Sequence, residues 1–152
     1  MDNPTRILVV DDDENIREAI AAILEKEGYI VEAVGTGKEA IEKSNSRLYN
    51  LALIDIRLPD MEGTELLTKM KETTPKMRKI IMTGYPALEN AVYAVNKDAN
   101  AYLIKPIEIG ELLNIIKAQL KKQEEEKKYS QEKVVEFIET RAREIQELTS
   151  KV

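Results

Sequence analysis

Short runs of apolar residues alternate along this chain with longer segments in which apolar residues recur every three or four positions. Five runs have the length and composition of buried strands, bounded by polar or turn-forming residues: 6–10, 29–34, 51–55, 79–83 and 101–104. Helical spacing of apolar residues, with capping signals, predicts helices over 14–27, 36–44, 64–71, 88–96 and 109–120. This alternation predicts an α/β fold in which helices cover both faces of one parallel sheet, open and doubly wound because such crossovers are right-handed.

Local signals mark several helix starts and turns. Asp13 stands where the N-cap of the first helix is expected. Thr36 and Glu39 form the T-x-x-E pattern of a capping box, which predicts the start of the second helix. Asp60 and Glu62 are interpreted as turn and cap residues without a chemical role.

Polar residues stand at the points where the predicted strands end. They are Asp11 and Asp12 after the first strand, Asp55 at the end of the third, Thr83 at the end of the fourth, and Lys105 after the fifth. The carboxyl ends of parallel strands meet at one edge of an open sheet, where such folds bind ligands. The sequence therefore predicts one site assembled from distant segments. No glycine-rich loop follows the first strand, so neither a dinucleotide fingerprint nor a P-loop is present.

Three carboxylates in one cleft predict a bound cation. At ~5 Å and an effective dielectric constant of ~20, two carboxylates repel by roughly 3 kcal/mol, so they stay ionised together only around a positive charge. An all-oxygen ligand set favours Mg²⁺ or a similar hard ion. A carboxylate such as Asp55 beside Mg²⁺ can attack phosphorus and form an acyl phosphate. The ammonium of Lys105 and the hydroxyl of Thr83 are suited to stabilise the oxygens of the transferred group.

Composition narrows the chemistry further. The 152 residues include no cysteine and no histidine, which excludes disulfides, thiolate or imidazole metal ligands and a phosphohistidine within them. The net charge of −5 falls on residues 1–120, because residues 121–152 contain eight basic and eight acidic side chains. An acidic domain argues against direct binding to nucleic acid. Without a membrane span or a signal peptide pattern, we expect a cytoplasmic protein that does not bind membranes.

Four motifs resemble the receiver domain of two-component response regulators. They are ILVVDDD at 7–13, LIDIRLPDMEG at 53–63, MTG at 82–84 and YLIKP at 102–106. The motifs match in order and spacing, and the resemblance extends from the first predicted strand to the end of the predicted helix over 109–120. It implies a flavodoxin-like (βα)5 receiver fold with strand order 2-1-3-4-5 and, in this chain, a C-terminal helical extension.

The resemblance implies a role for each residue at the predicted site. Asp55 would accept a phosphoryl group from the phosphohistidine of a sensor histidine kinase or a phosphotransfer protein. Mg²⁺ or Mn²⁺ would be bound, with Asp12 as the direct ligand, by a set of four groups: Asp11, Asp12, Asp55 and the backbone carbonyl of Arg57. Lys105 would contact the phosphoryl group, and the Lys105-Pro106 peptide bond is expected to be cis.

The resemblance also implies a conformational switch. After phosphorylation, Thr83 would donate a hydrogen bond to the new phosphoryl oxygens, and Tyr102 would move inward. The surface that would then change shape to favour a partner-binding state is formed by 88–96, 101–104 and 109–120. Arg57 and Tyr85, each two residues beyond a site residue, are expected to tune the lifetime of the phosphoryl group.

These observations predict a phosphorylation-activated switch of a phosphorelay rather than an enzyme with turnover. Its only chemistry would be self-phosphorylation and slow autodephosphorylation, and it would act on a downstream protein or on an output domain outside these residues. Two alternatives are a scaffold that keeps the fold without phosphorylation, and an aspartate-nucleophile phosphohydrolase of the haloacid dehalogenase type. Arg57 counts against the hydrolase, because that class needs an aspartate two residues after the nucleophile.

The C-terminal segment has a composition of its own. Residues 1–122 are predicted to form the receiver domain, and residues 123–152 a charged helical tail that acts as a linker or a dimerisation helix. Apolar residues have heptad-like spacing in the tail, with an interruption at Arg141: Val134, Ile138, Ile145 and Leu148. A solvated helix and a dimerising coiled coil both fit this pattern. A homodimer could form through the tail or through the predicted switch surface.

Overall fold

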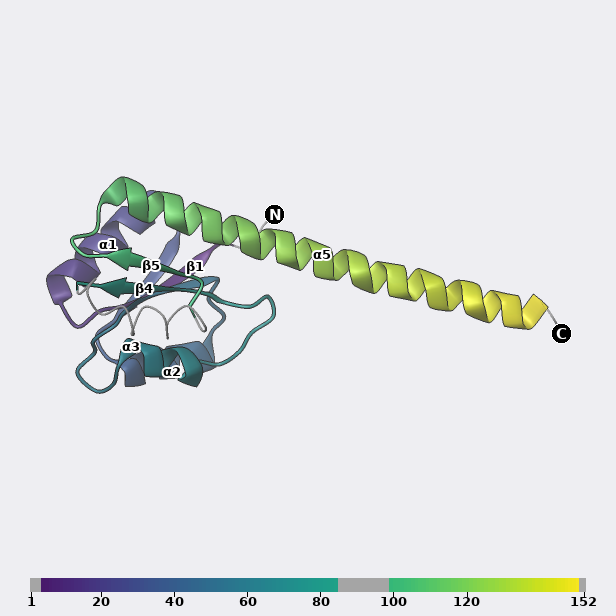
Figure 1. The fold of residues 1–152 in the computed structure, drawn as a ribbon, viewed down its shortest axis with the longest axis horizontal. Coiled ribbons are helices and arrows are strands. Elements are labelled where there is room, and N and C mark those ends of the chain that lie inside the picture. The colour runs from purple at the N-terminus through teal and green to yellow at the C-terminus, as the bar shows by residue number, and fades with distance from the viewer. Residues whose placement is uncertain (1–3, 85–98, 151–152) are drawn as a thin grey trace.

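Five parallel strands form one sheet in the computed structural model, which describes residues 4–84 and 99–150. The strand order is β2-β1-β3-β4-β5 (Figure 1). The strands are β1 (Arg6–Val10), β2 (Ile30–Val34), β3 (Leu51–Asp55), β4 (Arg78–Thr83) and β5 (Ala101–Ile104). The predicted parallel sheet and its strand order are therefore confirmed.

Helices cover both faces of the sheet (Figure 1). One face carries α1 (Glu14–Lys26) and α5 (Ile109–Ser150), and the other carries α2 (Gly37–Ser46) and α3 (Gly63–Lys69). Successive side chains of a strand point to opposite faces, so the core divides into two clusters. In β3, Leu53 packs in the cluster with α1 and α5, whereas Ile54 packs in the cluster with α2 and α3.

The ends of the helices follow local hydrogen bonds. Asp13 caps α1 as predicted, since its carboxylate accepts hydrogen bonds from the backbone N–H groups of Asn15 (2.9 Å) and Ile16 (3.2 Å). The Thr36 hydroxyl accepts one from the N–H of Glu39 (3.1 Å), also as predicted. The prediction for α2 ended two residues too early and that for α3 two residues too late. The helix predicted over 88–96 lies outside the described residues.

The helix α5 is much longer than the domain on which it packs. It runs without a break for 42 residues, lies against the sheet near its start and then projects away from the body (Figure 1). The predicted boundary between residues 122 and 123 falls within this helix, so the division into a domain and a tail stays a prediction. Hydrogen bonds between α5 and the sheet body extend past that boundary, to Glu126. No helix in the described part of the chain has the length and apolar content needed to cross a membrane.

Candidate functional site

Two buried carboxylates lie side by side at the carboxyl edge of the sheet. Asp11 follows β1 and is fully buried, and Asp55 ends β3 and is 8 % exposed. Since β1 and β3 are neighbours, with Val10 opposite Ile54, the sheet register brings the two acids together. Asp12 is exposed beside them, and one carboxylate oxygen from each of the three residues lies within 4.8 Å of the others. The predicted acidic cluster is thus present.

Lys105 follows β5, the outer strand beyond β4, and reaches these acids along the same edge of the sheet. Its Nζ lies 2.8 Å from Asp11 Oδ2 and 3.2 Å from Asp55 Oδ2. The backbone holds it there, because its N–H donates to the carbonyl of Thr83 (2.7 Å). The Lys105-Pro106 peptide bond is cis, as predicted. Of the five predicted strand-end residues, Asp11, Asp55 and Lys105 are therefore joined by side-chain contacts. Asp12 lies within 4.8 Å of the two other acids, and Thr83 is joined through its backbone.

The electrostatics of the site oppose the ionisation of Asp55. Burial raises the pKa of Asp55 above its ordinary value, and the charge of Asp11 adds to that effect. The N–H of Arg57, which donates to Asp55 Oδ1 (3.2 Å), and the ammonium of Lys105 act in the opposite direction. Burial alone would lower the pKa of Lys105, but its contacts with Asp11 and Asp55 raise that pKa instead. A divalent cation among these acids would favour their ionised forms.

The loop after Asp55 folds back tightly on the end of β3. The N–H of Gly63 donates to the carbonyl of Ile56 (2.7 Å). A Cβ atom at position 63 would collide with the carbonyl oxygen of Asp55, so this position requires glycine. Arg57, whose carbonyl is the fourth predicted metal ligand, lies within this loop and pairs with Glu62 in an isolated bridge.

Two residues that support the site were not recognised from the sequence. Asp60 was interpreted as a turn residue, but its carboxylate accepts hydrogen bonds from the backbone N–H groups of Gly37 and Lys38, both at 2.9 Å. It therefore caps α2 from 23 positions away and ties the loop after Asp55 to that helix. Arg17 of α1 donates from Nη1 to the carbonyl of Asp11 (2.8 Å). Neither contact has a local sequence signal.

The predicted switch residues lie on β4 and β5. Thr83 is buried at the end of β4, whereas Tyr102 of β5 is 41 % exposed. Ile104, two residues further along β5, is also exposed, at 44 %. Tyr85, predicted to tune the phosphoryl lifetime, lies outside the described residues.

The donors at this site match the chemistry of a hard divalent cation. They are carboxylates, and all of them come from loops or strand ends at one edge of the sheet. An ion held there would supply positive charge next to Asp55, where phosphoryl oxygens would accumulate negative charge. The ammonium of Lys105 supplies a second positive group next to the same carboxylate.

Comparison with known proteins identifies the family to which this domain belongs. The family model described as "Response regulator receiver domain" matches residues 7–117. The chain is 39 % identical over 106 residues to the transcriptional regulatory protein ZraR of Klebsiella oxytoca, covering 70 % of this chain and 24 % of that protein. It is 36 % identical over 121 residues to the response regulator ArlR of Staphylococcus saprophyticus, covering 78 % of this chain and 54 % of that protein. The chain thus spans between a quarter and about half of these relatives.

Solved structures show the same architecture. A response regulator receiver domain protein (CheY-like) from Methanospirillum hungatei JF-1 superposes with a TM-score of 0.75 at 48 % identity, covering 82 % of this chain and 99 % of that one. NtrX from Brucella abortus in complex with ADP gives a TM-score of 0.76 at 28 % identity, covering 84 % of this chain and 30 % of that one. In both comparisons most of this chain takes part in the match.

Proposed function

Because the chain belongs to the receiver domain family of response regulators, we propose that it is a phosphorylation-activated switch of a two-component phosphorelay, with Asp55 as the phosphoacceptor. One observation carries this proposal: Asp11, Asp12 and Asp55 converge at one edge of the sheet, and Lys105 contacts two of them. Structural packing alone gives no reason to gather three carboxylates, two of them in contact with one ammonium group.

The phosphoryl donor would be the phosphohistidine of a histidine kinase or a phosphotransfer protein. An oxygen of Asp55 attacks phosphorus, the P–N bond breaks, and the imidazole nitrogen leaves with the bonding electron pair. Lys105 lies 3.2 Å from Asp55 Oδ2, so its ammonium can neutralise the oxygens of the incoming group. The product is an acyl phosphate on Asp55.

Mg²⁺ or Mn²⁺ would be held by Asp11, Asp12 and Asp55, with the backbone carbonyl of Arg57 as a fourth ligand. When bound, the ion supplies positive charge that lowers the cost of bringing phosphoryl oxygens to an acidic site. Lys105 already bridges two of these acids through their Oδ2 atoms, so a bound ion and its ammonium would share the same two carboxylates. The tight loop that Gly63 and Asp60 support would fix the position of Arg57.

The response would pass through Thr83 and Tyr102. The new phosphoryl group adds about −1.5 to −2 charges next to the end of β4, where the Thr83 hydroxyl can donate a hydrogen bond to it. Tyr102, now 41 % exposed, would then move inward and change the surface around β5 and the first turns of α5. A downstream protein, or an output domain of a longer chain, would bind the changed surface. The relatives named above are transcriptional and response regulators, which supports a regulatory role.

Intact-protein mass spectrometry after incubation with acetyl phosphate and Mg²⁺ tests the proposal. We expect the mass of one added phosphoryl group, lost with Asp55→Asn and in the presence of EDTA. Asp13→Asn is the matched control, because Asp13 adjoins the same acidic loop but caps α1. A mass gain that survives Asp55→Asn would refute the assignment of Asp55. Partner binding that is the same for wild type and Asp55→Ala would instead support a phosphorylation-independent scaffold.

A further inference from the structure

The projecting part of α5 carries large apolar side chains that are exposed. Every residue from 124 to 150 is exposed, and α5 leaves the sheet body over this stretch (Figure 1). Six of its apolar side chains are between 53 and 67 % exposed: Val134, Val135, Phe137, Ile138, Ile145 and Leu148. Apolar side chains on a helix normally face a core, but these six are not buried by the described residues.

These side chains fall into a heptad pattern. If Ile138 and Ile145 occupy a positions, Val134 and Leu148 occupy the d positions next to them. β-branched residues at a with leucine at d favour parallel coiled coils of two strands, and this register has isoleucine at two a positions and leucine at one d position, 148. Phe137 precedes one a position at g, which widens the apolar stripe.

Arg141 occupies the d position in the middle of the stripe. Its Nη1 lies 2.8 Å from Glu144 Oε2 of the same helix. The charge is therefore compensated within one chain, and the aliphatic stem of Arg141 can lie along the seam while its head group stays in water. The interruption noted in the sequence does not place an isolated charge in the stripe.

The apolar area agrees better with an interface than with a solvated helix. A side chain of this size exposes roughly 100 Å², so six per copy give about 1,200 Å² for two copies, which is the lower end of the range for specific interfaces. A helix stabilised by water and ion pairs would be polar on all sides. α5 does carry such pairs, for example Lys133–Glu136 at 3.6 Å, but it keeps the apolar stripe beside them.

We propose that residues 131–150 of two copies of this chain form a parallel two-stranded coiled coil, with both receiver bodies at the same end. The body of each copy is joined firmly to its helix. Arg78 of β4 binds Gln119 and Glu126, and Gln123 donates to the carbonyls of Asn50 and Lys76. The coiled coil therefore sets the distance and orientation between two receivers. It forms independently of the proposed phosphoryl chemistry.

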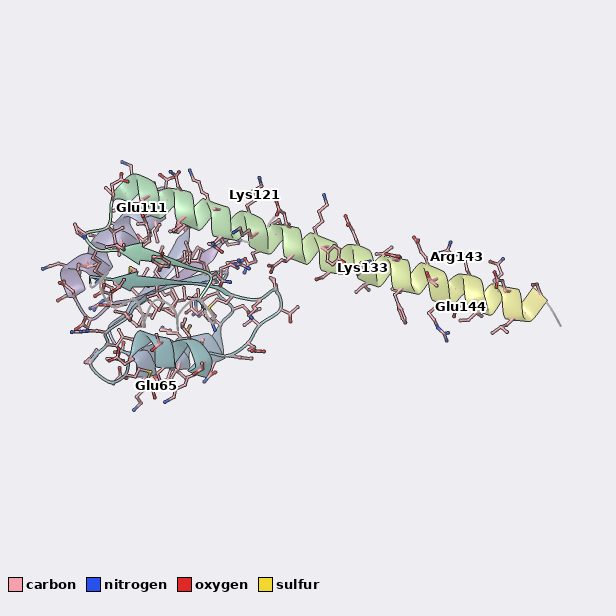
Figure 2. All side chains as sticks on the ribbon, in the orientation of Figure 1. Glu65, Glu111, Lys121, Lys133, Arg143 and Glu144 are labelled. Carbon is pink, nitrogen blue, oxygen red and sulfur yellow. The ribbon has the colours of Figure 1, made fainter. Side chains whose placement is uncertain are left out.

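Analytical ultracentrifugation of the full chain without a phosphodonor tests the association. We expect a dimer, with a dissociation constant raised by roughly 100-fold or more in the double variant Ile138→Lys with Ile145→Lys. The matched control is Lys133→Gln with Arg143→Gln, two residues of the projecting helix labelled in Figure 2. Both positions lie outside the seam, so this variant should keep the dimer. A wild-type monomer at all concentrations would overturn the proposal, and so would a dimer unaffected by the two lysines.

Single cysteines report the orientation of the helices, because the natural chain has none. Under mild oxidation, Val134→Cys is expected to form a disulfide between two copies, whereas Arg143→Cys, outside the seam, is not. An equimolar mixture of Val134→Cys and Ile145→Cys tests the antiparallel alternative, in which a d position of one helix faces an a position of the other. A mixed disulfide without either homodisulfide would indicate an antiparallel pair and would overturn the parallel arrangement.

Discussion

Lys105 Nζ lies 2.8 Å from Asp11 Oδ2, although 94 positions separate the two residues. This contact joins the end of the first strand to the end of the fifth, across the carboxyl edge of the sheet. The same ammonium lies 3.2 Å from Asp55. Lys105 therefore offsets part of the negative charge of the site and contacts two of the carboxylates that a divalent cation would bind.

Replacing Lys105 with methionine should separate these two effects. Without the ammonium, less of the negative charge of Asp11 and Asp55 is compensated. Mg²⁺ should therefore bind more tightly, by roughly tenfold. Phosphorylation by acetyl phosphate should fall strongly, because the transferred oxygens lose a positive partner. Isothermal titration calorimetry measures the first effect and mass spectrometry the second. Lys69→Met, which removes an exposed partner of Glu65, should change neither. Weaker Mg²⁺ binding in Lys105→Met would contradict the view that the ammonium and the ion compete for the same carboxylates.

The raised pKa of Asp55 predicts an unusual effect of pH on stability. Because its pKa is higher in the folded protein, the stability that this group contributes is fully present below the unfolded pKa of about 3.9. That contribution is lost as the pH rises through the folded pKa. At neutral pH, Asp55→Asn should therefore increase the free energy of unfolding relative to wild type. The difference should shrink as the pH falls from neutral through the folded pKa, and it should be smallest below about 4.

Urea unfolding in the presence of a chelator tests this prediction over a series of pH values. Asp12→Asn is the matched control, since it removes an exposed carboxylate from the same cluster and should have a smaller effect on stability. Added Mg²⁺ should stabilise wild type more than Asp55→Asn. An Asp55→Asn variant that is less stable than wild type at neutral pH would contradict the electrostatic description of the site.

The contribution of Asp60 to the stability of the fold should depend on pH in the opposite direction. Its hydrogen bonds from the N–H groups of Gly37 and Lys38 lower its pKa below the ordinary value. The stability it contributes is thus present above the unfolded pKa and lost as the pH falls through the folded pKa. Asp60→Ala should lower the urea midpoint at neutral pH and have little effect in acid. Glu62→Ala is the control, because Glu62 stands at the N-cap of α3 but makes no capping hydrogen bond. Equal losses in both variants would argue against the role of Asp60.

The sequence predicted those parts of the fold that leave a local pattern. Strands buried in a parallel sheet are continuous apolar runs, so β3 was predicted with its exact ends, and the site residues followed from the strand ends. Asp60 could not be assigned in this way, because its partners lie 23 positions away and nothing near it in sequence marks them. The heptad pattern of the tail did not decide between a solvated helix and a coiled coil. The choice depends on exposed area and side-chain pairing, which spacing does not reveal.

A buried polar cluster connects the receiver body to the long helix. Arg78, at the start of β4, is 8 % exposed and donates from Nε (3.0 Å) and Nη2 (2.8 Å) to Gln119 Oε1 of α5. Its Nη1 lies 3.0 Å from Glu126 Oε1, further along the same helix. One guanidinium thus binds two residues of α5 that are seven positions apart, about two helical turns.

Arg78→Met should therefore be strongly destabilising. It leaves the buried carboxamide oxygen of Gln119 without its donor, which costs about 1–3 kcal/mol of unfolding free energy. Arg47→Met is the matched control: Arg47 also binds a carboxylate at 3.0 Å, that of Glu32, but its side chain is 52 % exposed, so the loss should stay below about 1 kcal/mol. Urea unfolding followed by circular dichroism measures both. If the two variants lose the same small amount of stability, the cluster does not fix α5 to the sheet, and the link between receiver and coiled coil must lie elsewhere.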